Sequence, residues 1–185
     1  ERVEDPSEVA AELLANHLIV GWFQGRSEYG PRALGHRSIL GNPKNSSIKE
    51  RINSRIKFRE EFRPFAPSVT EEASNDYFDL GIMQSSPYMT VALPVRQAKF
   101  SEIPGVTHVN GTARVQTVSR VDDDRYHRLI SKFGELTGTP VVLNTSFNVR
   151  GQPIVESPLD ALGTFASCGL DALLIGNYLV KKPHR

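Results

Sequence analysis

A glycine-rich segment with three arginines, residues 25–38, is the first stretch whose residue types suggest chemistry. Gly25 and Gly30 are five positions apart, as in a P-loop, but Pro31 and Arg32 stand where that motif has its lysine and its serine or threonine. Flexible backbone N–H groups beside guanidinium groups bind phosphate or carboxylate oxygens. The segment therefore predicts an anion-binding loop, and arginines paired with acids on a surface loop are the alternative.

A basic run at residues 49–63 is the second candidate. Lys57 could pair with Glu61 four residues later, as on an ordinary solvated helix, and the charge pattern alone favours that interpretation. Arg63 differs because it precedes the rigid segment 64–67, whose two prolines fix its direction. We therefore expect Arg63 to be a positioned anion ligand.

Two further groups lie at expected strand ends. Arg114 follows the Asn110-Gly111 turn and could aim its guanidinium at a ligand, although a half-covered arginine within a strand is the alternative. Asn144 and Ser146 follow a short apolar run, and ligands of open α/β sheets gather at such strand ends. This polar run predicts a binding site, and simple turn capping is the alternative.

The elements that must position these residues follow from apolar periodicity and from capping signals. Ile48, Ile52 and Ile56 are four apart and share one helix face. Residues 24–43 are expected to be a long irregular loop. We expect helices at residues 6–16, 46–63, 70–78 and 124–137 and one that begins at the Ser157-Pro158 cap, with strands at 18–23, 64–69, 89–95, 107–109, 114–118, 140–144 and 172–180. Strands and helices interleave without a strict βαβ rhythm, which predicts an α/β (α+β) fold with a twisted, mixed open sheet flanked by helices.

Composition limits the class of protein. The 185 residues are 39% hydrophobic and 23% charged, which suits one domain over residues 1–185. A net charge of +1 provides no global attraction to nucleic acid or anionic lipid. Cys168 is the only cysteine, so it has no intrachain disulfide partner, and we expect a soluble protein in the reducing cytoplasm. The five histidines show no metal-ligand spacing, so no metal site of the chain's own is expected.

Four motifs in order carry a resemblance to a known family. They occupy residues 25–35, 63–67, 111–117 and 143–148. Through them, from about Leu18 to Val180, the chain resembles the C-terminal domain of the carbamoyltransferases that include nodulation-factor and antibiotic O-carbamoyltransferases. The resemblance implies a YrdC-like fold that binds ATP and carbamoyl phosphate and forms carbamoyl adenylate, with Mg²⁺ on the nucleotide phosphates.

The resemblance also implies roles for single residues. Lys57, Arg63 and Arg114 match catalytic positions of the family. Asn110 departs from the family pattern, where an aspartate is more usual. The positions that match substrate-binding residues are Arg32, Asn144 and Ser146.

The family resemblance further implies that a partner domain is missing. A Kae1-like domain, expected upstream and absent from this chain, would transfer the carbamoyl group to a hydroxyl acceptor, so that Glu1 begins within a linker. A YrdC-like nucleic-acid-binding module without catalysis is the alternative function. The nearly neutral net charge and the lack of a basic stripe with interleaved aromatic residues argue against it.

Overall fold

The computed structural model describes residues 1–60 and 63–182, and its main feature is a seven-stranded sheet. The strand order is β6-β3-β7-β2-β1-β8-β9, and β4 and β5 form a separate pair. The strands are β1 (Val20–Phe23), β2 (Arg37–Gly41), β3 (Ala66–Thr70), β4 (Ala92–Pro94), β5 (Thr112–Arg114), β6 (Gln116–Val118), β7 (Val141–Ser146), β8 (Ala172–Ile175) and β9 (Tyr178–Lys181). The β1–β8 and β3–β6 pairs are parallel, whereas β1–β2, β2–β7, β3–β7 and β8–β9 are antiparallel. The predicted mixed α/β fold is therefore confirmed.

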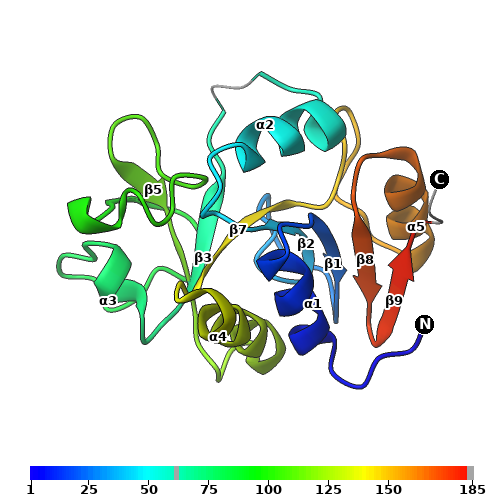
Figure 1. Ribbon diagram of the computed structural model, residues 1–185, viewed down its shortest axis with the longest axis horizontal. Coiled ribbons are helices and arrows are strands. Elements are labelled where there is room, and N and C mark those ends of the chain that lie inside the picture. The colour runs from blue at the N-terminus through cyan, green and yellow to red at the C-terminus, as the bar shows by residue number, and fades with distance from the viewer. Residues whose placement is uncertain (61–62, 183–185) are drawn as a thin grey trace.

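Helices cover both faces of this sheet (Figure 1). They are α1 (Pro6–Ala15), α2 (Ile48–Ile52), which continues into the π-helical turn η1 (Asn53–Lys57), α3 (Ser74–Tyr77), the 3-10 turn η2 (Gln97–Lys99), α4 (Asp124–Thr137) and α5 (Pro158–Ser167). In Figure 1, α1 and α4 lie in front of the sheet, and their core includes Leu14 and Phe133. On the other face Ile52 from α2 and Phe165 from α5 belong to a second core. Each fully buried side chain of this size contributes about 1.5–3 kcal/mol to the free energy of unfolding.

The helix ends follow their capping residues. The Asp5 side chain accepts the Ser7 N–H at 2.8 Å, and Asp123 accepts that of Tyr126 at 2.9 Å. Ser157 and Asp160 form a reciprocal capping box at the start of α5. The predicted start of α5 and the predicted span of α4 are thus confirmed.

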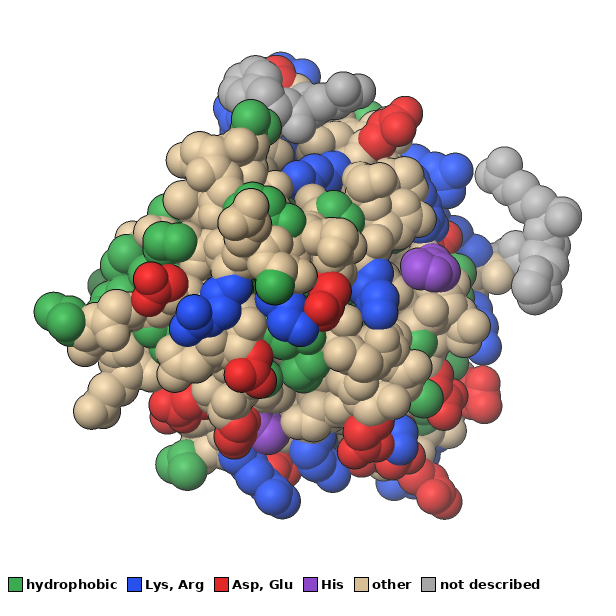
Figure 2. All heavy atoms as spheres, turned by 60° about the vertical axis from the view of Figure 1, so that its left-hand side comes forward, with side chains coloured by type: hydrophobic (Ala, Val, Ile, Leu, Met, Phe, Trp, Pro, Cys, Tyr) green, Lys and Arg blue, Asp and Glu red, His purple; other side chains and the backbone are tan. Residues whose placement is uncertain are grey.

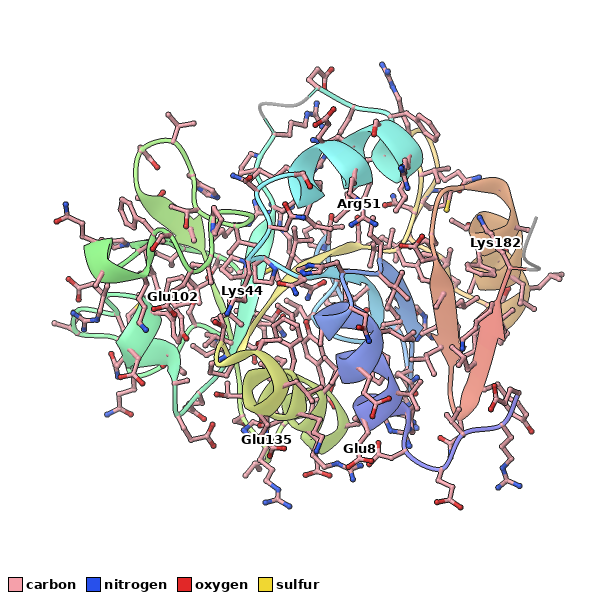
Figure 3. The ribbon with its side chains drawn as sticks, viewed as in Figure 1. Glu8, Lys44, Arg51, Glu102, Glu135 and Lys182 are labelled. Carbon is pink, nitrogen blue, oxygen red and sulfur yellow. The ribbon has the colours of Figure 1, made fainter. Side chains whose placement is uncertain are left out.

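Polar side chains attach α2 to the rest of the domain. Figure 3 shows Arg51 pointing from α2 toward the sheet, where it donates to the His17 carbonyl at 2.8 Å and pairs with Asp171 at 3.5 Å. Lys44, just before α2, donates to the Thr137 carbonyl at the end of α4 at 2.6 Å. These contacts fix the helix that leads into Lys57.

Four expectations for the strands and helices were wrong. The loop expected at residues 24–43 contains β2, a central strand whose Ile39 and Leu40 enter opposite cores. Only two of the five residues of β2 are aliphatic, so the sequence does not show the apolar run that is typical of a central strand.

Residues 107–109 form no strand, since His108 N–H closes a tight turn on the Thr112 carbonyl and β5 pairs with β4 instead. The strand expected at 172–180 is a hairpin that reverses at Gly176, whose φ is 52°. The helix expected at 46–63 ends at Lys57 because Phe58 is left-handed, with φ 46°.

No helix in the described part of the chain is both long enough and apolar enough to cross a membrane.

Candidate anion-binding site

Lys57 lies at the centre of the site. It is 6% exposed and comes from the end of η1, on the face opposite α1 and α4. Its Nζ donates to the carbonyl oxygens of Ser146 at 2.5 Å and Asn148 at 3.0 Å, and it lies 2.8 Å from Asn148 Oδ1 and 3.2 Å from Ser146 Oγ. Burial, helped by the nearby positive charge of Arg59, lowers the pKa of Lys57 to about 7. The solvated-helix interpretation of Lys57 is therefore wrong, and the Glu61 partner that it named lies outside the described residues.

The backbone after α2 explains why Lys57 turns inward. A π-helical turn displaces side chains from their α-helical positions, and such turns occur often at functional sites. Phe58 then adopts a left-handed conformation, which costs a residue other than glycine on the order of 1–3 kcal/mol. The two features together place both Lys57 and Arg59 beside the end of β7.

A small cavity of about 90 Å³ lies between the loop before β2, the end of β7 and β5. Its polar lining consists of Arg32, Arg59, Arg114, Asn144, Thr145 and Ser146. None of the described lining residues is acidic. Three guanidinium groups around one cavity favour an anion as its ligand.

A larger cavity of about 270 Å³ adjoins the first. Its cations are Lys57, Arg59, Arg63 and Arg150, and Glu60 is the one acidic residue among its described lining residues. Arg63 is exposed, and its Nε pairs with Glu60 Oε2 at 3.1 Å. Arg59 and Ser146 line both cavities, so the two form one continuous site.

The arginines of this site destabilise one another's charged form. Burial lowers the pKa of Arg59, and the charge of Arg63 lowers it further. Burial likewise lowers the pKa of Arg114, with a contribution from Arg32. Arg114 Nε is also buried, with no hydrogen-bond partner among residues 1–60 and 63–182. A bound anion would offset both the repulsion and the missing partner.

Arg59 is the residue that sequence interpretation missed. Its Nε donates to Asn53 Oδ1 at 3.0 Å, and its guanidinium lies over the Phe65 ring at 4.5 Å from the ring centre. These contacts hold Arg59 against the cavities, whereas the charge pattern assigned it to an exposed helix face. Asn148 was missed as well, because an asparagine two positions after Ser146 looks like an ordinary turn residue.

Asn144 has a structural role that its sequence position did not reveal. It is 1% exposed, and its Nδ2 lies 3.1 Å from Ala33 O, Ser68 Oγ and Gln116 Oε1. Its Oδ1 is buried and has no hydrogen-bond partner in the described part of the chain, and the residue lines the small cavity. Asn144 therefore attaches the loop that carries Arg32 to the sheet.

The structure brings all six predicted residues to the two cavities, while their chemical roles stay predictions. Arg32, Arg114 and Asn144 line the small cavity, Lys57 and Arg63 line the large one, and Ser146 lines both. Asn110 lines neither cavity. Its side chain accepts the Thr112 hydroxyl at 2.8 Å and serves the turn before β5.

A groove of about 420 Å³ continues from the large cavity along α5. Gln152 lines both spaces. Apolar residues form much of the groove, including Ile154 and Leu159, and two acids, Glu156 and Asp160, stand beside them. The site thus joins a cationic region to a partly apolar one.

Charges of opposite sign mix over one face of the molecule (Figure 2). Figure 2 shows Lys and Arg side chains interspersed with Asp and Glu on the face turned toward the viewer. Among the described residues seen in that view, no continuous basic groove appears. This pattern does not favour the nucleic-acid alternative on that face.

Comparison of the sequence with known proteins identifies its relatives. A family model described as carbamoyltransferase C-terminus matches residues 11–182. The nodulation protein NolNO of Sinorhizobium fredii is 50% identical over 98% of this chain, which spans 27% of that protein. NolO of Bradyrhizobium diazoefficiens is 47% identical over 98% of the chain, which spans 33% of it. The chain therefore covers about a third or less of the length of these relatives.

Two solved structures share the fold. Full-length HypF in its phosphate- and nucleotide-bound form matches 95% of this chain, with a TM-score of 0.63 and 17% identity, over 21% of the HypF chain. P. abyssi Sua5 complexed with L-threonine matches 92% of this chain, with a TM-score of 0.62 and 16% identity, over 46% of the Sua5 chain. The domain thus has the YrdC-like fold that HypF and Sua5 share.

Proposed function

The chain belongs to the carbamoyltransferase C-terminal family, and from that premise we propose that it binds ATP and carbamoyl phosphate and joins them to form carbamoyl adenylate. One observation carries the proposal. Two adjoining cation-lined cavities share Arg59 and Ser146. A site for one phosphorylated ligand needs one such cavity, whereas bringing two phosphorylated substrates together needs two in contact.

The chemistry that this arrangement supports is transfer at the α-phosphorus of ATP. Carbamoyl phosphate and water would give carbamate and inorganic phosphate. A carbamate oxygen would then bond to the α-phosphorus while the bond to pyrophosphate breaks. Cations fixed on both sides would offset repulsion between the anions and stabilise charge on the departing pyrophosphate, so positioning and electrostatics supply most of the rate.

The position of Lys57 and of each arginine indicates which substrate it would bind. Lys57 is a point charge held by η1 at the end of β7, and Arg59 stands where the two cavities meet. Arg32 and Arg114 would bind the smaller substrate. Arg63 and Arg150 lie at the outer cavity, where the nucleotide's phosphates would lie.

The groove along α5 suits the nucleoside part of ATP. It adjoins the large cavity at Gln152 and offers Ile154 and Leu159 as apolar surface for a base. Its carboxylates, Glu156 and Asp160, could accept hydrogen bonds from ribose hydroxyls. The expected direction of the nucleotide is therefore from the cationic cavity toward α5.

Mg²⁺ fits this site as a companion of the nucleotide. Among the described residues no group of three or more His, Cys, Asp or Glu could hold a metal ion. Glu60 is the only carboxylate described at the cavities, and it pairs with Arg63. Mg²⁺ keeps water ligands and is bound largely by phosphate oxygens, so it would neutralise charge on the bound nucleotide without a protein cage.

Transfer to a hydroxyl acceptor is proposed for the remaining part of a longer protein. The relatives are much longer than this chain, which leaves room for the Kae1-like partner domain that the family resemblance implies. We expect the 185-residue chain to release pyrophosphate from ATP in the presence of carbamoyl phosphate and to carbamoylate no sugar or antibiotic hydroxyl. Mass spectrometry of acceptor mixtures tests the second expectation, and a carbamoylated acceptor formed by this chain alone would overturn it.

A further inference from the structure

The loop between β1 and β2 holds Arg32 on a short exposed segment with fixed ends. Residues 29–32 make no hydrogen bond to any other described residue, and Arg32 is exposed. The residues on either side of this segment are held tightly. Residues 29–32 are thus the free tip of an otherwise fixed loop, and this tip carries Arg32, a cation of the small cavity.

A single carboxylate oxygen binds the second half of the loop, residues 33–37. Glu28 Oε1 accepts the backbone N–H groups of Leu34 and His36, each at 2.7 Å, and of Arg37 at 3.3 Å. These bonds fold the chain back on itself and enclose residues 29–33. A charged acceptor strengthens such bonds relative to neutral ones.

Two carbonyl groups of the same segment accept hydrogen bonds from strands of the sheet. Asn144 donates to the Ala33 carbonyl at 3.1 Å, and Gln116 donates to the Leu34 carbonyl at 2.6 Å. Gly35 packs so closely on the Tyr126 ring, with φ 117°, that any side chain there would collide with it. The backbone after Arg32 therefore has one arrangement, and Glu28 provides the part that comes from the loop itself.

The first half of the loop is attached at Arg26 and Ser27. Ser27 Oγ donates to Glu156 Oε2 at 2.5 Å, and His36 Nδ1 lies 2.6 Å from the Arg26 carbonyl oxygen. Glu28 follows these attachments and directly precedes the free tip, and its bonds to Leu34 and His36 close the loop around residues 29–33. Its loss would leave Arg32 on a longer free segment.

From this geometry we infer that Glu28 is a positioning residue that acts through Arg32, by fixing the loop so that the guanidinium reaches the anion in the small cavity. The inference rests on the proposed function, since it takes carbamoyl phosphate as that anion. Glu28 itself lines neither cavity, so it touches no substrate there. Its contribution to binding should therefore depend on the presence of Arg32.

A double-mutant cycle on carbamoyl phosphate affinity tests this dependence. Arg32→Ala and Glu28→Ala should each weaken binding about tenfold, the loss expected for one charge-assisted hydrogen bond. In the Arg32→Ala background, Glu28→Ala should change affinity by less than about twofold, since a residue that acts only through another adds nothing once that other is gone. In an Arg114→Ala background, which removes a cation from β5, Glu28→Ala should retain its full effect.

Two controls keep the test decisive. Glu28→Gln retains the accepting oxygen without the charge, so it should bind carbamoyl phosphate with an affinity between those of the wild type and Glu28→Ala. Thermal unfolding measures folding separately, and if Glu28→Ala fails to fold, the cycle is run with Glu28→Gln. Multiplicative losses in the Arg32→Ala background, or an unchanged affinity of Glu28→Ala beside a weakened Arg32→Ala, would overturn the inference alone. A wild type that binds no carbamoyl phosphate would overturn the proposed function and the inference with it.

Discussion

Lys57 and Asn148 lie 91 positions apart in the chain, yet the lysine Nζ is 2.8 Å from the asparagine Oδ1 and 3.0 Å from its carbonyl oxygen. The bond joins the end of η1 to the turn after β7. It buries a cation among oxygen atoms, two of which belong to Ser146, a residue that lines both cavities. The charge state of this lysine should therefore control anion binding.

The pH dependence of ATP affinity follows from this burial. The pKa of Lys57 in the free site is about 7, so the ammonium loses its proton as the pH rises through about 7 and anion binding must then restore it. Apparent affinity should fall by up to about tenfold per pH unit above that point. Calorimetry from about pH 6 to about pH 9 measures the slope, and the Lys57→Arg variant, which stays charged throughout, should lack it. An equal slope in both proteins would assign the titration to another group.

Arg59 should matter to both substrates because it lines both cavities. Arg59→Ala should weaken ATP and carbamoyl phosphate by about 1.5–3 kcal/mol each, the value of a charge-assisted hydrogen bond. Arg55→Ala is the matched control, since Arg55 is an exposed arginine of η1, four positions before Arg59, and its loss should cost less than about 0.5 kcal/mol. Separate calorimetric titrations test this, and equal losses in the two variants would show that Arg59 is an ordinary surface charge.

Ser146 should bind substrate and form no covalent intermediate. Its Oγ donates to Asn148 Oδ1 at 2.8 Å, and no histidine or carboxylate is hydrogen-bonded to it among the described residues. Lys57 Nζ, 3.2 Å away, is the one ionisable group hydrogen-bonded to it in the part of the chain that the structure describes, and it acts as a donor to the surrounding oxygens. Ser146→Ala should slow pyrophosphate release without abolishing it. Radiolabel from carbamoyl phosphate retained on the denatured peptide that carries Ser146 would show instead that the serine is a nucleophile activated by Lys57.

Filling the groove along α5 should separate nucleoside binding from phosphate binding. A Cβ at Gly163 meets no atom within 4 Å, and Gly163 lines the groove, so Gly163→Leu should place its side chain there. It should weaken ATP binding about tenfold and leave inorganic triphosphate binding unchanged, because triphosphate lacks the nucleoside. Gly163→Ala is the control, since alanine stabilises the helix by about 1 kcal/mol and fills little of the groove. Equal affinities of wild type and Gly163→Leu for ATP would place the nucleoside elsewhere.

Local signals predicted the elements whose caps and apolar periods agree. Gly138 marked the end of α4 at the predicted residue, and Pro6 marked the start of α1. β2 was missed because a central strand draws its stability from pairing on both sides, which composition does not display. Long-range pairing also decided β5, whose partner is β4 and not the nearer segment 107–109.

Some residues of the candidate site could likewise be predicted from the sequence, and others could not. Arg32, Arg63, Arg114 and Ser146 belong to motifs that family resemblance identifies, and the fold brings them together. Arg59 could not be distinguished from other cations of its run, because its direction depends on the π-helical turn and on the left-handed Phe58. The bracing role of Asn144 depends on contacts with residues 28 to 111 positions away.

Exchange of radiolabelled pyrophosphate into ATP tests the central claim most directly, because it requires the bond to the α-phosphorus to form and break reversibly. With this chain, ATP, Mg²⁺ and carbamoyl phosphate, label should enter ATP, and it should not do so when carbamoyl phosphate is left out. The Arg59→Ala variant should slow the exchange, and Arg55→Ala should not. If the folded wild-type chain binds ATP and carbamoyl phosphate but supports no exchange, or if exchange proceeds without carbamoyl phosphate, the assignment of carbamoyl adenylate formation to this domain is contradicted.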